Sequence, residues 1–135
     1  MILGTGIFGC SNDKIALKSY YGKYVVATSD GAANANQLLR GASEIFTVEK
    51  LGENYCALKS TYGKYLVADR DRIDANRGGR GAWETFTFLR QTDGTYAIKT
   101  AHGRYVVAES DGRLQGSSRR IGNQEKFTAE CITSA

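Results

Sequence analysis

The sequence predicts an all-β domain with internal threefold repetition, and two observations support this. A phrase of the form Ala-Leu/Ile-Lys-Ser/Thr-x-x-Gly-Lys/Arg-Tyr-Val/Leu-Val-Ala occurs three times, at residues 16–27, 57–68 and 97–108. No stretch of the chain shows a sustained helical period with a cap. The repeated glycines, Gly22, Gly63 and Gly103, are 41 and 40 residues apart, so each repeat is a supersecondary unit rather than a single element.

Each repeat is expected to contain about four strands. In the first repeat Ile15 and Leu17 alternate with polar or small residues, and a turn at Gly22 leads into an apolar, β-branched segment. This pattern is typical of a hairpin, in which glycine takes a positive φ without steric cost. A polar loop follows, over Asp69 to Asp74 in the second repeat, then a short third strand and a fourth strand. Arg40 and Arg80 recur before the fourth strands, with Arg120 as a weaker third copy. The fourth strands are expected to begin at Phe46, Phe86 and Phe127.

Three such units predict a β-trefoil, with a six-stranded barrel capped at one end by three hairpins. The repeats cover approximately residues 13–51, 52–92 and 93–132 of a single domain over residues 1–135. A propeller is the competing architecture, but it needs about four blades or more. The side chains expected to face the interior are Ile15, Leu17, Tyr24, Val26, Phe46, Val48, Cys56, Leu58, Tyr65, Val67, Phe86, Phe88, Tyr96, Ile98, Tyr105, Val107 and Phe127.

The repeated phrase resembles the strand-turn-strand signature of fascin-like domains, and the resemblance extends over nearly all of residues 13–131. A free-standing trefoil of this kind is similar to hisactophilin, which is rich in histidine, whereas this chain has only His102. A histidine-based pH switch is therefore not expected. The resemblance implies a non-catalytic module that binds or cross-links actin filaments.

Positive charge is the feature of the sequence that bears most on a partner. The formal net charge is +4, which favours an acidic partner: an actin filament or another acidic protein surface, or anionic lipid. Lysines that alternate with the inward residues, cations that follow the turn glycines, and two loop arginines form the candidate partner-binding set: Lys18, Lys59, Lys99, Lys23, Lys64, Arg104, Arg77 and Arg80. A solvated rim of charge is the alternative interpretation of this set.

Nucleic acid is a poor candidate partner. A charge of +4 is modest for a nucleic-acid binder, and the single Arg-Gly-Gly stretch at residues 77–79 lies inside a structural repeat.

Neither catalysis, nor a metal, nor another cofactor is predicted. His102 is the only histidine and lies at a turn position where the other repeats have tyrosine. Arginines interrupt the acidic residues between Asp69 and Asp74, and the spacing does not match an EF-hand. The repeated glutamates, Glu44, Glu84 and Glu125, are expected to make hydrogen bonds at the entry to the fourth strand, with Arg40 and Arg80 as their ionic partners.

Two further classes of function remain open, a carbohydrate-binding lectin and an interaction scaffold. Aromatic residues at the turns could stack on sugars, namely Tyr20, Tyr21, Tyr62 and Trp83. The chain lacks the Gln-x-Trp repeats of ricin-type lectins.

The three cysteines have different expected roles. Cys56 occupies an inward position and is expected to be a small buried hydrophobe. Cys10 and Cys131 lie near the two ends of the chain, which a closed barrel brings together, and whether they pair stays open. An odd number of cysteines and the absence of an N-glycosylation sequon favour a reducing, cytoplasmic location.

The first ten residues are expected to form an extended strand beside the barrel. No apolar run is long enough to span a membrane.

Overall fold

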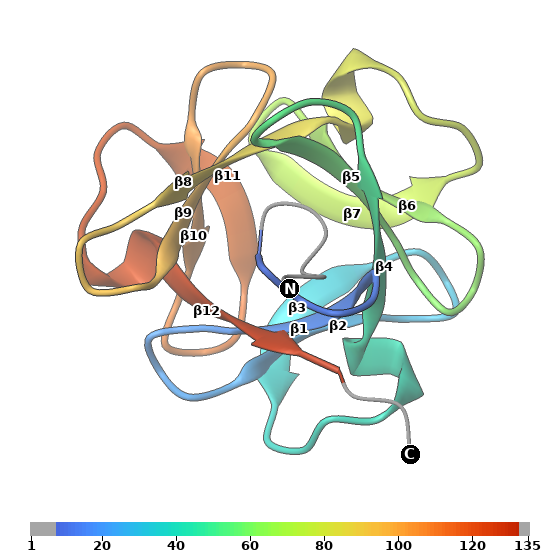
Figure 1. Cartoon of the computed structure of the whole chain (residues 1–135), viewed down its shortest axis with the longest axis horizontal. Helices are drawn as coiled ribbons and strands as arrows, with labels where there is room; N and C mark the ends of the chain where they lie inside the picture. The colour runs from blue at the N-terminus through green and yellow to red at the C-terminus, as the bar shows by residue number, and fades with distance from the viewer. Residues whose placement is uncertain (1–7, 133–135) are drawn as a thin grey trace.

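Each repeat contributes four strands and one turn of 3₁₀ helix to the computed structural model, which describes residues 8–132. The first repeat contains β1 (Lys14–Lys18), β2 (Tyr24–Ala27), β3 (Ala33–Gln37), η1 (Ala42–Glu44) and β4 (Phe46–Lys50). The second contains β5 (Tyr55–Lys59), β6 (Tyr65–Asp69), β7 (Arg72–Arg77), η2 (Ala82–Glu84) and β8 (Phe86–Arg90). The third contains β9 (Tyr96–Lys99), β10 (Tyr105–Ala108), β11 (Leu114–Ser118), η3 (Asn123–Glu125) and β12 (Lys126–Cys131). Figure 1 shows the repeats as three lobes around a common centre.

The first and fourth strands of the three repeats close into a barrel. Antiparallel pairing runs β1–β4–β5–β8–β9–β12 and returns to β1. The second and third strands form the hairpins β2–β3, β6–β7 and β10–β11. The predicted six-stranded barrel with three hairpins is therefore confirmed.

The three hairpins are joined to one another by equivalent backbone hydrogen bonds. The amide of Ala35 donates to Gly112 O at 2.7 Å, that of Ala75 to Gly31 O at 2.8 Å, and that of Gly116 to Asp71 O at 2.7 Å. Each bond crosses from one repeat to another, so the cap closes as a ring.

The repeated Ser/Thr-x-x-Gly forms the turn that follows each first strand. The backbone amide of Tyr21 donates to Ser19 Oγ at 3.1 Å, and Tyr62 and His102 make the same bond to Ser60 and Thr100. The glycine that follows has a φ between +76° and +79° in all three repeats. These φ values lie in the left-handed region, which glycine adopts without steric cost because it has no Cβ, so glycine recurs at this position.

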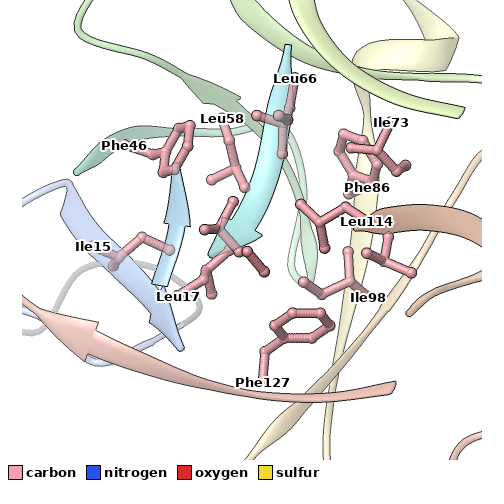
Figure 2. Packing of buried hydrophobic residues seen from close by; sticks show 14 of the residues in the cluster. Ile15, Leu17, Phe46, Leu58, Leu66, Ile73, Phe86, Ile98, Leu114 and Phe127 are labelled. Carbon is pink, nitrogen blue, oxygen red and sulfur yellow. The ribbon is translucent and has the colours of Figure 1, made fainter. Parts of the chain in front are cut away.

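Phenylalanines from the fourth strands and aliphatic residues from the first strands meet inside the barrel. Phe46, Phe86 and Phe127 are at most 1% exposed, and Figure 2 shows them around a common centre with Leu17, Leu58 and Ile98. Burying these rings removes a large apolar area from water, which stabilises the closed barrel.

The predicted register of the second strands is wrong by one residue. Val25, Leu66 and Val106 belong to the core cluster, whereas the predicted Val26, Val67 and Val107 are buried but lie outside it. The predicted Tyr24, Tyr65 and Tyr105 also lie outside that cluster. Each second strand alternates regularly, with the tyrosine outside the cluster and the next residue inside it, so the prediction assigned the wrong face of this strand to the core. The pairing register shifts after each tyrosine, and the extra residue lies on the third strand.

Two sequence alignments of the repeats also need correction. The segment from Asp69 to Asp74, expected as a loop, is mostly strand, and only Arg70 and Asp71 separate β6 from β7. The one-residue shortening of the second repeat lies in this hairpin. The residue that precedes the capping glycine is Arg40 or Arg80 in the first two repeats but Ile121 in the third, so Arg120 is not their equivalent.

The segment before β1 lies against the end of the barrel that is opposite the hairpins. The Phe8 ring meets Phe88 and Tyr96 edge-on, each at 5.0 Å between centroids. Cys10 is buried and forms a disulfide with Cys131, which answers the question of their pairing. Residues 8–10 form no strand, and the rest of the strand expected over residues 1–10 lies outside the described residues. Among residues 8–132 no helix has the length and hydrophobicity needed to cross a bilayer.

Candidate binding surface

Cations at the turns after β1, β5 and β9 lie at equivalent positions around the rim of the hairpin cap. Lys23, Lys64 and Arg104 each follow the turn glycine and precede the tyrosine that opens the next strand. Lys64 is exposed and the other two are partly exposed. None of the three forms an ion pair with a carboxylate of residues 8–132. Their charges are therefore available to a partner.

The lysines that end the first strands pack against aromatic rings. Lys18, Lys59 and Lys99 place Nζ at 5.3, 5.4 and 5.9 Å from the ring centroids of Tyr24, Tyr65 and Tyr105. At these distances the ammonium group is attracted by the face of the ring. These predicted site residues thus support the start of the second strand while keeping part of their surface in solvent.

The two predicted loop arginines are paired within the chain. Arg77 contacts Asp69 at 3.1 Å and Glu84 at 3.9 Å, and Arg80 contacts Glu49. A partner that used either guanidinium would compete with these carboxylates.

The expected pairing of Arg40 with Glu44 and of Arg80 with Glu84 is wrong. Arg40 contacts Glu130 at 2.7 Å instead, because the fourth strand of the third repeat lies beside it. The repeated glutamates instead accept hydrogen bonds from backbone amides just before the fourth strand, as predicted from the sequence. Glu44, Glu84 and Glu125 each accept from the glycine that precedes the 3₁₀ turn, at 2.6–2.7 Å.

Sequence reasoning missed a tyrosine–glutamate–arginine cluster that occurs at two of the three junctions between repeats. Tyr24 donates to Glu130 at 2.8 Å, and Arg40 contacts the same oxygen. The hydrogen bond to Glu130 and burial raise the pKa of the Tyr24 phenol. Tyr65, Glu49 and Arg80 form the second cluster.

The third junction is apolar, with Leu89 and Ile121 at the positions of the glutamate and the arginine. Both polar partners are replaced together. This paired change between repeats is the signal in the sequence that could have revealed the clusters.

The aromatic residues considered for sugar stacking mostly join neighbouring repeats. Tyr62 shares a hydrogen bond of 2.9 Å with Ser43, Tyr21 contacts Gln124, and the rings of His102 and Trp83 meet at 5.0 Å. These are equivalent contacts between a turn and the 3₁₀ helix of another repeat. His102 Nε2 also lies 2.9 Å from Ala68 O. His102 therefore contacts the second repeat through both a ring–ring contact and a ring nitrogen, which is a structural role.

A depression of about 390 Å³ lies where the three hairpins meet. Side chains from all three repeats line it, including Asn34, Asp74 and Gln115. None of the predicted site residues reaches it. In the described part of the chain, no group of three or more His, Cys, Asp or Glu side chains is placed to hold a metal ion.

The loops between the third strands and the 3₁₀ helices differ in chemical character among the repeats. The residues at the same place in this loop are Leu38 and Leu39 in the first repeat, Gly78 and Gly79 in the second, and Arg119 and Arg120 in the third. The third-repeat loop, together with Arg104, concentrates positive charge on one side of the cap.

Comparison with known protein families agrees with this geometry. The family model of the fascin domain matches residues 32–129, well over half of the chain. None of the curated proteins compared with the chain matches it. The matched region includes the second and third repeats in nearly their full extent and the last half of the first. The chain belongs to the fascin family.

Proposed function

We propose that the protein is a non-catalytic module of the cytoplasm that binds actin filaments through the basic rim of its hairpin cap. The rim comprises Lys23, Lys64 and Arg104, flanked by Lys18, Lys59 and Lys99, with Arg77 and Arg80 as secondary contributors. Membership of the fascin family supports a binding role. The observation that carries the proposal is the threefold set of turn cations without ionic partners among the described residues.

The cations of the rim differ in how readily they could contact a filament, because some of them are already paired with carboxylates. Lys23, Lys64 and Arg104 can move toward an acidic surface without breaking an ion pair with a described carboxylate. Arg77 and Arg80 would first have to leave their carboxylate partners. We therefore assign the turn cations the main role. Exposed charge contacts of this kind are weak one by one and are screened by salt.

The disulfide does not agree with the predicted cytoplasmic location. Disulfides persist mainly in oxidising compartments, so the Cys10–Cys131 bond favours such a setting over the cytoplasm. The cytoplasmic location stays a prediction, to be checked by imaging a tagged protein in cells.

Filament co-sedimentation tests the proposal. The protein should pellet with F-actin at low ionic strength and release as salt is added. The variant Lys23→Glu/Lys64→Glu should pellet several-fold less. Its matched control is Lys50→Glu/Arg90→Glu, which makes the same change in net charge at equivalent exposed positions at the opposite end of the barrel. Equal losses in both variants, or no pelleting at low salt, would argue against the rim.

The lectin and scaffold alternatives receive less support. Tyr21, Tyr62 and Trp83 are engaged between repeats, which leaves Tyr20, at 58% exposure, as the freest of the candidate rings. A glycan array run beside the filament assay would detect a lectin. Cross-linking requires two filament sites or a dimer, and electron microscopy of the actin mixture would reveal bundles.

A further inference from the structure

Two adjacent leucines project into solvent from the loop between β3 and η1. Leu38 is 72% exposed and Leu39 is 82% exposed, the highest values among the large hydrophobic side chains of the described residues. Exposing apolar surface of this size is unfavourable in water, so such a pair calls for an explanation.

The fold itself does not require leucine at these two positions. The second repeat has Gly78 and Gly79 there and the third has Arg119 and Arg120, and all three loops lead into equivalent 3₁₀ helices. Neither leucine belongs to the core cluster. The pair therefore contributes to something other than folding.

Positive charge lies directly beside the leucines. Tyr24 pairs with Gln37 across the hairpin, so Lys23 and Leu38 occupy the next positions along its two arms. The second repeat has the same geometry, where Lys64 Nζ lies 4.0 Å from the place that a Cβ would take on Gly78. The turn that carries Lys23 also exposes Tyr20, whose ring stands edge-on to Tyr21. Leu38, Leu39, Lys23 and Tyr20 together form what we call the leucine loop surface.

We propose that the leucine loop surface binds anionic lipid bilayers, with Leu38 and Leu39 inserted among the acyl chains. Lys23 would lie at the level of the lipid phosphates, and Tyr20 would lie at the interface, where tyrosine is enriched in membrane proteins. Apolar insertion and attraction to anionic lipid are the two contributions that together give stable peripheral binding.

A bilayer fits this surface better than a protein partner does. Two leucine side chains expose far less than the roughly 800 Å² per partner that a stable protein interface buries. A bilayer needs no complementary shape, and it accepts a small apolar tip with cations around it. Lys23 belongs to both the basic rim and the leucine loop surface, whereas Leu38 and Leu39 belong only to the second. Substitutions at the two leucines therefore test bilayer binding separately from filament binding.

Vesicle flotation with the full chain tests the proposal. The probes are phosphatidylcholine vesicles with and without phosphatidylserine, and binding is expected only where phosphatidylserine is present. The variant Leu38→Ser/Leu39→Ser should bind about tenfold or more weakly, because it removes the apolar contribution. Leu51→Ser is the matched control, since Leu51 is also exposed but lies at the opposite end of the barrel. Both variants should keep the thermal midpoint of the parent protein.

A spectroscopic measurement separates insertion from surface attraction. In a Trp83→Phe background, Leu39→Trp should show a blue-shifted emission on vesicles that contain phosphatidylserine, because the indole leaves water. An unshifted emission, no vesicle binding at all, or equal loss of binding in Leu51→Ser would overturn the proposal. Loss of filament pelleting with vesicle binding unchanged in Leu38→Ser/Leu39→Ser would assign the leucines to a protein partner instead.

Discussion

The phenol of Tyr65 donates a hydrogen bond of 2.8 Å to Glu49 Oε1, and so links the hairpin of the second repeat to the last strand of the first. Arg80 contacts the same carboxylate oxygen from the loop before η2. The equivalent contact of Tyr24 with Glu130 joins the first repeat to the third. These bonds connect the barrel to the cap across the junctions between repeats.

Replacing Glu49 alone should cost more stability than replacing Glu49 and Arg80 together. Glu49→Leu leaves the Arg80 guanidinium and the Tyr65 hydroxyl without their acceptor, which is unfavourable at a partly buried site. Glu49→Leu/Arg80→Ile reproduces the apolar third junction, where Leu89 and Ile121 stand. Chemical denaturation of the two variants gives the comparison. A double variant less stable than the single one would show that the two side chains do not act as a unit.

The tyrosines of the two polar junctions should make stability fall in alkaline solution. The hydrogen bond to Glu49 raises the folded-state pKa of Tyr65 above its ordinary value of 10.0, with burial and the glutamate charge adding to it. The native state therefore keeps this proton where the unfolded chain has lost it. The contribution is complete below pH 10 and is lost as the pH rises through the folded-state pKa. Denaturation midpoints measured below and above pH 10 should diverge less for Tyr65→Phe than for the parent protein.

The repeat in the sequence is enough to predict the barrel and the hairpin cap, because each copy carries its own turn signal and its own alternation. Ser19 and Gly22 are three residues apart, and the hydrogen bonds of the turn lie within this four-residue segment. The face of the second strand was not predictable from alternation, because all four residues of β2 are apolar or aromatic and all four are buried, so the pattern does not distinguish the two faces.

The candidate site was predictable only in part. The position of Lys23 and Lys64 after the turn glycines follows from local sequence, and both cations lie where that prediction puts them. The partner of Arg40 does not, because Glu130 is 90 residues away and becomes a neighbour only when the barrel closes. The binding role of the rim stays a prediction.

Truncation of Leu58 in the barrel should destabilise the protein strongly. Leu58 is fully buried and belongs to the core cluster, so Leu58→Ala leaves a cavity that the closed barrel cannot collapse to fill. The expected loss in the free energy of unfolding is about 2–5 kcal/mol. Leu51→Ala, at a leucine that is 41% exposed, should change it by no more than about 0.5 kcal/mol. Similar losses at both positions would contradict the assignment of Leu58 to the core.

A methyl group at Gly31 should disturb the contact between two hairpins. Gly31 has a φ of +93°, and a Cβ there would lie 2.7 Å from Asn76 Cβ in the second repeat. Gly31→Ala therefore combines backbone strain with a clash, and the expected loss is about 1–3 kcal/mol by thermal or chemical denaturation. Gly79 is the control, because nothing lies within 4 Å of a Cβ at that position. Gly79→Ala should leave stability unchanged or raise it slightly, and a loss equal to that of Gly31→Ala would rule out the hairpin contact as the cause.

Removing the Cys10–Cys131 disulfide should lower stability without changing the fold. The bond joins residues 121 positions apart, and the chain-entropy model assigns a crosslink over such a loop about 5 kcal/mol. Cys131→Ser, or reduction of the parent protein, should lower the denaturation midpoint while the far-ultraviolet spectrum stays that of a β protein.

Alkylation before and after reduction of the disulfide shows which of the three thiols are free. Burial raises the pKa of the Cys56 thiol to about 12, and its side chain is fully buried. The native oxidised protein should therefore take up no alkylating reagent, whereas the unfolded oxidised protein should take up one equivalent, at Cys56. Rapid labelling of the native protein at Cys10 or Cys131 would show that the two thiols are not paired.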